Sequence, residues 1–263
     1  MQLKGDVCMK RLKGKTTVIT GGGSGIGLSA SKRFAAEGAS VIVLEVDDSS
    51  GKKVEREIID SGGACRFIQT DISDVSSVAA AFAIIQKDYA KIDVLYNNAS
   101  VFLGKLDGPV DTLDFMTFEK IVKINLYGLF ACSHYAIPLM KKEGGSIINT
   151  ASSAAVIGIP NCDAYTASKG ATVALTRSFA VEFGPFGIRT NCIAPAAIMT
   201  PMVYESNLND PNFDEKKFLS TGTPLRRWGT PDDIASVALF LASDESSYLN
   251  GAIITADGGI TIS

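Results

Sequence analysis

Short apolar runs alternate along the chain with amphipathic stretches of helical length. The run Thr16 to Thr20 is β-branched, whereas Leu28 to Gly38 carries Phe34 and Ala35 on one apolar stripe and ends on a glycine that suits a helix stop. The same patterns predict strands at residues 16–20, 41–44, 65–69, 94–96, 146–150, 189–193 and 252–255. They predict helices at residues 28–38, 51–61, 75–89, 118–140, 164–183 and 232–241.

Strands and helices therefore alternate over nearly the whole chain. Successive strands joined through helices form right-handed crossovers, which give a parallel sheet with helices on both faces. The pattern indicates one α/β domain over residues 1–263, with a doubly wound sheet of about seven strands. The stretch from about 196 to 230 is irregular and rich in Pro, Asn, Asp and Gly, and we expect it to form a lid over the substrate.

The charge balance and the apolar runs exclude several classes of partner. The chain has 25 Lys and Arg against 28 Asp and Glu, a net charge of −3, and no basic block, which argues against nucleic-acid binding. No apolar run reaches the ~18 residues of a membrane span. The polar, basic stretch 1–15 lacks the apolar core of a secretory signal, so the expected location is the cytoplasm.

Cysteine and histidine usage argues against a metal site. His134 is the only histidine, which excludes zinc sites built on two or three histidines. The cysteines are odd in number, scattered and without a C-x-x-C pair, which is typical of reduced thiols: Cys8, Cys65, Cys132, Cys162 and Cys192. We expect no bound metal.

A glycine-rich turn lies between the first predicted strand and the first predicted helix. Glycine lets a backbone turn tightly and approach a pyrophosphate, whose charge suits a helix N-terminus. The spacing is G-x-x-x-G-x-G, and no lysine follows as in a phosphate-binding P-loop. By itself the turn is equally compatible with a flexible loop. The candidate cofactor residues in it are Gly21, Ser24, Gly25, Ile26 and Gly27.

Glu45 ends the second predicted strand, where an acidic side chain can bond to the ribose hydroxyls of an adenosine. A 2′-phosphate at that place would be repelled by the carboxylate, and neither Ser24 nor Val46 is an arginine that would offset the repulsion. The position therefore favours NAD over NADP, although an acid at a strand end can also be a solvated carboxylate.

Tyr165 and Lys169 form the only Y-x-x-x-K of the chain. At this spacing both side chains lie on one helical face, and a neighbouring ammonium lowers the pKa of a phenol toward the range of a general base. Ser152 follows the fifth predicted strand, at the sheet edge where open α/β folds bind ligands, although its neighbour Ser153 would serve equally well chemically. Tyr and Lys also meet at this spacing by chance, so the pair carries weight only in combination.

The combination resembles the short-chain dehydrogenase/reductase family, in its form with chains of about this length. The matching residues extend from Thr20 to Gly259 and include, besides the glycine turn, Glu45 and Tyr165 with Lys169, the following: Asp71-Ile72, Asn97-Asn98-Ala99, Asn125, Ser152, Asn191, Pro195, Ile198, Thr200 and Asp257-Gly258-Gly259. The resemblance implies a Rossmann-like single domain and an NAD(H)-dependent interconversion of a secondary alcohol and a ketone.

The resemblance also implies roles for individual residues. Tyr165 would be the acid/base, Lys169 would lower its pKa and hold the nicotinamide ribose, and Ser152 would orient the substrate. Asn125 would hold a water that connects Lys169 to solvent. The adenosine side would be lined by Glu45, Asp71, Ile72 and Asn98, and the carboxamide side by Pro195, Ile198 and Thr200. Two departures, Ser100 and Ala196 in place of the usual glycines, put cofactor affinity in doubt rather than the reaction.

Residues that flank these positions are expected to shape the substrate pocket and the assembly. Most of the flanking residues are apolar: Val101, Phe102, Leu103, Ala154, Val156, Ala197, Met199, Met202, Val203 and Tyr204. Polar contacts would come from Asn161, Cys162 and Asp163, and sugars, polyols, steroids, terpenoid alcohols and acyl thioesters all stay open as substrates. The resemblance implies a homotetramer, or a homodimer, built on the helices at 118–140 and 164–183, with His134 at a surface or interface.

Two other interpretations compete with the dehydrogenase. One is a catalytically silent NAD-binding sensor or scaffold of the same fold, against which the presence of all of Asn125, Ser152, Tyr165 and Lys169 speaks. The other is a sugar-nucleotide epimerase or dehydratase, which shares the tyrosine and lysine but normally needs a longer chain and a different glycine spacing.

Overall fold

The computed structural model describes residues 10–205 and 213–263. Cys8 and the part of the predicted lid at 206–212 lie outside the described residues. Seven strands form one sheet in the order β3-β2-β1-β4-β5-β6-β7, and every pair of neighbours is parallel. The strands are β1 (Thr16–Thr20), β2 (Ser40–Glu45), β3 (Ala64–Gln69), β4 (Val94–Asn97), β5 (Gly145–Thr150), β6 (Ile188–Pro195) and β7 (Ile253–Ala256).

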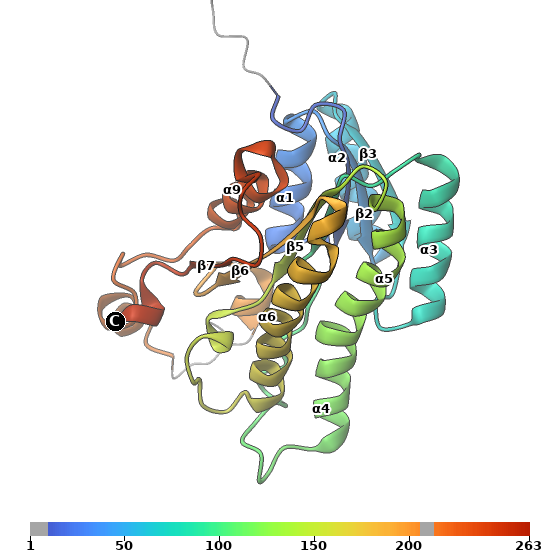
Figure 1. The fold of residues 1–263 in the computed structure, drawn as a ribbon. Coiled ribbons are helices and arrows are strands. Elements are labelled where there is room, and N and C mark those ends of the chain that lie inside the picture. Colours follow the sequence, from blue (N-terminus) through green and yellow to red (C-terminus); the bar gives the residue numbers. More distant parts are fainter. Residues whose placement is uncertain (1–9, 206–212) are drawn as a thin grey trace, which may run out of the picture.

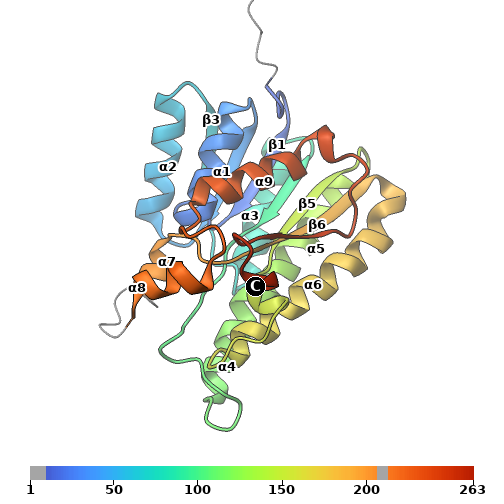
Figure 2. The ribbon, with the colours of Figure 1, turned by 90° about the vertical axis from the view of Figure 1, so that its left-hand side faces the viewer.

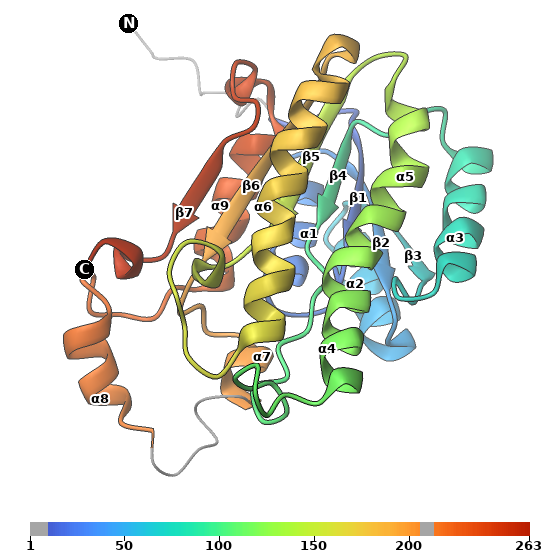
Figure 3. The ribbon, with the colours of Figure 1, turned by 60° about the horizontal axis from the view of Figure 1, so that its bottom comes forward.

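Helices cover both faces of the sheet, as the alternating pattern predicts (Figures 1 and 2). One face carries α1 (Gly25–Ala36), α2 (Asp48–Asp60) and α9 (Pro231–Ala242), of which α1 and α9 lie side by side. The other carries α3 (Val75–Asp88), α5 (Gly128–Met140) and α6 (Asp163–Phe183), while α4 (Phe115–Val122) extends α5 beyond the sheet edge (Figure 3). The doubly wound α/β fold class is therefore confirmed.

The apolar core lies in two layers, one on each side of the sheet. Val41 and Val43 point to the layer under α1, α2 and α9, and Ile42 and Leu44 to the layer under α3 and α5. All four side chains are fully buried. Because both faces are covered, the central strands are continuous apolar runs rather than alternating ones.

Helix starts differ from the sequence prediction because polar caps extend them. α2 begins at Asp48 rather than at residue 51, since the Asp47 carboxylate accepts a hydrogen bond from the Ser50 amide at 2.8 Å. Asp114 likewise accepts from the Thr117 amide at 3.0 Å, so α4 begins three residues before the predicted start at 118. These carboxylates satisfy amides that have no partner within the helix.

The predicted single helix at 118–140 contains a π-helical turn, η1 (Lys123–Tyr127). The backbone runs through it continuously, from α4 into α5. Apolar periodicity cannot reveal one widened turn, which is a common device at functional sites. Here it carries Asn125, which is only 2% exposed.

The described part of the predicted lid contains short helical segments rather than only loop. These are α7 (Pro201–Val203), α8 (Glu215–Lys217) and the π-helical turn η5 (Phe218–Gly222). The two ends of the segment meet in one parallel bridge, in which Met199 donates to the Gly229 carbonyl at 2.8 Å and Gly229 donates to the Ala197 carbonyl at 2.9 Å. The lid is thus anchored at its base.

The contact between α2 and β3 predicts the effect of one substitution on stability. Replacing a glycine inside a helix with alanine usually raises the free energy of unfolding by about 1 kcal/mol. At Gly51, however, a Cβ would lie 2.2 Å from the ring of Phe67. We expect Gly51→Ala to lower the free energy of unfolding by about 1–2 kcal/mol, as overpacking does. Urea unfolding measures the change.

The matched control is the double variant Gly51→Ala/Phe67→Leu. Removing the ring should restore room for the methyl group. The double variant should therefore lose less free energy of unfolding than the sum of the losses in the two single variants. A Gly51→Ala protein more stable than the parent would contradict the predicted clash.

Candidate active site

A cavity of about 990 Å³ opens at the carboxyl edge of the sheet. Its lining includes residues that follow or end six strands: Gly21 after β1, Glu45 of β2, Asp71 after β3, Asn98 after β4, Ser152 after β5 and Pro195 of β6. β2 and β3 are added in turn on one side of β1, and the chain then crosses to place β4 on its other side. The strand order therefore reverses beside β1. Open α/β sheets bind ligands at such a switch point.

The glycine turn brings the backbone of α1 to this cavity. Gly21 and Gly25 have φ of 63° and 50°, which favour glycine, and a Cβ on Gly27 would lie 2.0 Å from the Gly21 carbonyl oxygen. Ser24 is the N-cap residue, but its side chain makes no capping hydrogen bond. The first amides of α1 therefore face a site that suits an anion. Gly21, Ser24, Gly25 and Ile26 line the cavity, whereas Gly27 acts through the tight turn.

Glu45 both lines the cavity and holds the glycine turn. Its Oε2 accepts a hydrogen bond from the Gly23 amide at 3.1 Å, and its Oε1 accepts one from the Val46 amide at 2.9 Å. The side chain is 9% exposed. Among the described residues that line the cavity, the cations are Lys120 and Lys123 of α4 and η1, and none is an arginine.

The remaining predicted cofactor residues also meet at this edge. Asn98 donates from Nδ2 to the Thr20 and Gly21 carbonyl oxygens at 3.2 and 3.3 Å, which ties the end of β4 to the glycine turn. The other predicted residues that line the cavity are Asp71, Ile72, Pro195, Ile198 and Thr200, together with the two departures from the family pattern, Ser100 and Ala196.

Tyr165 and Lys169 lie one turn apart on α6, as their spacing predicts. The Lys169 Nζ lies 5.5 Å from the centroid of the Tyr165 ring. The lysine is 2% exposed and donates to the Thr150 carbonyl oxygen at 2.9 Å. Burial lowers the pKa of Lys169 from 10.5 to about 8, because the ammonium loses its hydration.

The expected lowering of the Tyr165 pKa by Lys169 is not what the structure shows. Burial of the phenol raises its pKa to about 12, and the hydrogen bond with the Ser152 side chain opposes this only in part. The physical reason is that desolvation of the phenolate dominates while the ammonium is directed to Thr150. Tyr165 in this form is a protonated group that can donate its proton.

Asn125 is placed beside this pair by the π-helical turn. Its Oδ1 accepts from the Val101 amide at 2.8 Å, while its Nδ2 donates to the Val101 carbonyl at 2.9 Å and to the Ser168 hydroxyl at 3.2 Å. The side chain thus fastens the loop after β4 to α6. Its predicted role in holding a water stays a prediction.

Asp107 is a positioning residue that sequence reasoning missed. Its carboxylate, 8% exposed, accepts hydrogen bonds from the amides of Gly108, Ala164 and Tyr165 at 2.9, 3.1 and 2.9 Å. It therefore caps α6 at the residue that carries the phenol. The sequence offered a turn signal in Asp107-Gly108-Pro109, but nothing that connected it to a helix 57 residues later.

The substrate side of the cavity agrees only in part with the predicted lining. The predicted residues that line it are Val101, Phe102, Ala154, Cys162, Ala197, Met202 and Val203. The predicted residues outside the lining are Leu103, Val156, Asn161, Asp163, Met199 and Tyr204, of which Val156, Asn161, Asp163 and Tyr204 are exposed. Lining residues that the prediction missed include Ile159, Phe218, Trp228 and Ile260.

Other groups in the described residues add no second chemistry. No group of three or more His, Cys, Asp or Glu is placed to hold a metal ion there, and the four described cysteines are free thiols. His134 is exposed and contacts the ring of Tyr135. Within residues 10–205 and 213–263, none of the helices has the length and apolar character that a membrane crossing requires.

Comparison with known proteins agrees with the geometry of the site. A family model described as enoyl-(acyl carrier protein) reductase matches residues 21–261. A 2,5-dichloro-2,5-cyclohexadiene-1,4-diol dehydrogenase of Sphingobium indicum is 36% identical over 255 residues, which cover 96% of this chain and 99% of that protein. The chain belongs to the short-chain dehydrogenase/reductase family.

Solved structures support the same assignment. The crystal structure of levodione reductase has a TM-score of 0.89 and 34% identity, and the match covers 95% of this chain and 99% of that one. A crystal structure described as an NAD(P)-dependent gluconate 5-dehydrogenase from Beutenbergia cavernae, with bound NADP, has a TM-score of 0.89 and 31% identity over 97% and 100% of the two chains. This short-chain dehydrogenase/reductase is an oxidoreductase, and its homologues bind NAD(P).

The buried ammonium predicts how stability depends on pH. The folded state holds Lys169 at a pKa of about 8, against 10.5 in the unfolded chain, so between these values the unfolded state binds more protons and stability rises with pH. At ~1.4 kcal/mol for each pKa unit, the charged lysine costs up to about 3 kcal/mol at neutral pH.

The variant Lys169→Met lacks this charge. Its free energy of unfolding, compared with that of the parent in urea, should show an advantage that shrinks as the pH rises from about 8 toward 10.5. The variant also loses the hydrogen bond to the Thr150 carbonyl, but this loss shifts its whole curve of unfolding free energy against pH by a constant amount and does not produce the pH-dependent difference. Parallel curves would show that Lys169 keeps its ordinary pKa.

Proposed function

We propose that the chain is an NAD(H)-dependent dehydrogenase that interconverts a secondary alcohol and a ketone, with Tyr165 as the acid/base. The observation that carries the proposal is that Tyr165 and Ser152 line the same cavity as the glycine turn and Glu45. One cavity therefore unites a proton-transfer group with a cradle suited to a dinucleotide.

The residues present suit a dinucleotide. The open amides of α1 would hold a pyrophosphate, and the close approach of Gly27 to Gly21 leaves no room for a side chain there. Glu45, Asp71, Ile72 and Asn98 would surround the adenosine, while Pro195, Ile198, Thr200 and Tyr165 would border the nicotinamide half. Lys169, one turn after Tyr165 on α6 and outside the cavity lining, would hold the nicotinamide ribose. When bound, the dinucleotide supplies a hydride acceptor or donor.

The proton steps belong to the chain itself. In the direction of reduction, Tyr165, which its raised pKa keeps protonated, donates its hydroxyl proton to the substrate oxygen. In the direction of oxidation, the phenolate accepts the alcohol proton. Ser152 orients the substrate oxygen beside the phenol, and Lys169, fixed on the Thr150 carbonyl, holds its positive charge 5.5 Å from the centroid of the phenol ring.

We also infer that NAD is preferred over NADP. The Glu45 carboxylate borders the adenosine side, and the cavity lining there provides no arginine to balance a 2′-phosphate. The two charges would repel each other at short range in a partly desolvated site.

The assembly is proposed to be a homotetramer, or a homodimer, built on α4, α5 and α6. Several large apolar side chains on these helices are exposed in the single chain: Phe115, Met116, Tyr127, Phe130 and Val181. Exposed apolar surface of this kind marks an interaction site. The cytoplasmic location stays a prediction.

Removing the Tyr165 hydroxyl tests the proposed reaction. Tyr165→Phe keeps the ring that packs against Phe102 at 4.9 Å, so NAD binding should persist. The rate should fall by ~10²-fold or more, as expected for loss of a general acid/base. Calorimetric titration with NAD and turnover of an alcohol panel measure the two properties. Tight NAD binding without turnover by the parent protein would favour the silent sensor or scaffold.

The charge of Glu45 tests the cofactor preference. Glu45→Gln keeps an oxygen that can accept from the Gly23 amide and removes the negative charge. We expect the ratio of kcat/KM for NADP to that for NAD to rise by roughly tenfold or more, the equivalent of about 1.4 kcal/mol. A parent enzyme that already prefers NADP would show that Glu45 has been misassigned.

A further inference from the structure

The cavity that Tyr165 lines is walled in part by apolar side chains from four segments of the chain. They are Val101 and Phe102 after β4, Ile159 before α6, Phe218 and Trp228 of the lid, and Ile260 near the C-terminus. The Phe102 ring meets the Tyr165 ring edge-on at 4.9 Å. A substrate that reaches the phenol therefore lies against carbon surface.

The lid contributes aromatic faces rather than polar edges. The rings of Phe218 and Trp228 are stacked, with centroids 5.0 Å apart, and Phe213 lies against both. The indole N–H of Trp228 donates to the Glu215 carboxylate at 2.6 Å. Since its only donor group is bound within the lid, Trp228 offers an apolar face to the cavity.

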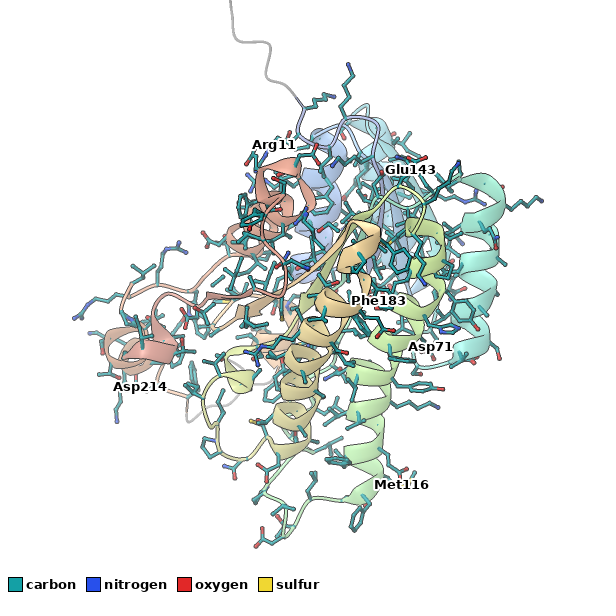
Figure 4. The ribbon with its side chains drawn as sticks, in the orientation of Figure 1. Arg11, Asp71, Met116, Glu143, Phe183 and Asp214 are labelled. Carbon is teal, nitrogen blue, oxygen red and sulfur yellow. The ribbon has the colours of Figure 1, made fainter. Side chains whose placement is uncertain are left out.

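The charged residues of the lining belong to other segments of the chain. Among the described residues that line the cavity, the charged ones are Glu45 and Asp71 at the adenosine side and three on α4 and η1, namely Glu119, Lys120 and Lys123. The helix that carries these three runs into Gly128, where an added Cβ would lie 2.7 Å from the Ile72 side chain. The start of α4, at Met116, also stands apart from the lid at Asp214 (Figure 4).

Among the described residues, the polar side chains next in sequence to Tyr165 and Ser152 are engaged or buried. The Ser152 side chain lies beside Tyr165 and accepts from the Ala154 amide, and Ser153 is 5% exposed. The Cys162 thiol contacts the Ile159 carbonyl and the Thr166 hydroxyl. A substrate oxygen at the reacting carbon finds partners in Ser152 and Tyr165, but further hydroxyl groups would be buried without partners, which is costly.

We propose that the substrate is a weakly polar alicyclic secondary alcohol or its ketone, and that sugars and polyols are rejected. This inference rests on the proposed function. A rigid carbon ring buries apolar area against Phe102, Phe218 and Trp228 and loses little conformational entropy on binding. In oxidation the ring carbinol loses a hydride from carbon to NAD⁺ and its hydroxyl proton to the Tyr165 phenolate, and the C–O bond becomes a carbonyl.

Matched ring compounds test the substrate class. Cyclohexanol and myo-inositol have the same carbon ring, but inositol carries a hydroxyl on every carbon, and decalol extends the apolar ring. With NAD⁺ and the whole enzyme, we expect kcat/KM to rise from cyclohexanol to decalol and to be at least about 10²-fold lower for inositol and glucose, because a single added hydroxyl already costs that factor in an apolar pocket.

The outcomes separate the two proposals. Turnover that favours inositol or glucose, or an acetoacetyl thioester over cyclohexanone in the reverse direction, would overturn the substrate class while leaving the dehydrogenase intact. Failure of every alcohol and ketone, with NAD or NADP, would remove the proposed function and the substrate class together.

A variant of the lid tests the wall itself. Phe218→Ala removes one of the stacked rings, and kcat/KM should fall at least about tenfold more for decalol than for cyclohexanol, since only the larger ring needs the extended apolar surface. Leu225→Ala is the matched control, because Leu225 belongs to the same segment, is 63% exposed and does not line this cavity. An equal loss on both alcohols would show that Phe218 supports the fold of the lid and does not contact the substrate.

Discussion

One hydrogen bond fixes the two halves of the proposed catalytic site relative to each other. The buried Nζ of Lys169 donates to the Thr150 carbonyl oxygen and so ties α6 to the carboxyl end of β5. An ammonium withdrawn from water needs such a partner, and Ser152 follows Thr150 by two residues. The helix that carries Tyr165 and the strand end that carries Ser152 are thereby held in register, and their hydroxyl groups meet.

Two further polar contacts hold the same helix from the side of the loop after β4. Asp107 caps the first turn of α6, and Asn125 joins the backbone of Val101 to Ser168. Together with Lys169, these two residues hold the helix that carries the phenol by hydrogen bonds at three points along its length. Such support is what keeps a reacting group within the narrow tolerance that proton transfer requires.

The sequence predicted the parts of this arrangement that are local or periodic. Strand and helix patterns gave the sheet, and the spacing of Tyr165 and Lys169 placed both on one face, because neither property depends on distant residues. The helix starts at Asp48 and Phe115 were not predicted, because a capping side chain extends a helix over residues that do not belong to its periodic apolar pattern. Asp107, Phe218 and Trp228 were missed because their importance arises from partners far away in the chain. The Tyr165 pKa was misjudged because spacing gives no measure of desolvation.

The small bridge between Ile198 and Gly229 has a consequence for how this scaffold diversifies. It closes the intervening segment into a loop whose two ends are fixed to each other, and the entropy of such a loop changes only slowly with its length. Insertions or replacements within it can therefore change this part of the cavity lining without disturbing the sheet. New specificities become accessible to evolution while the chemistry beneath stays as it is.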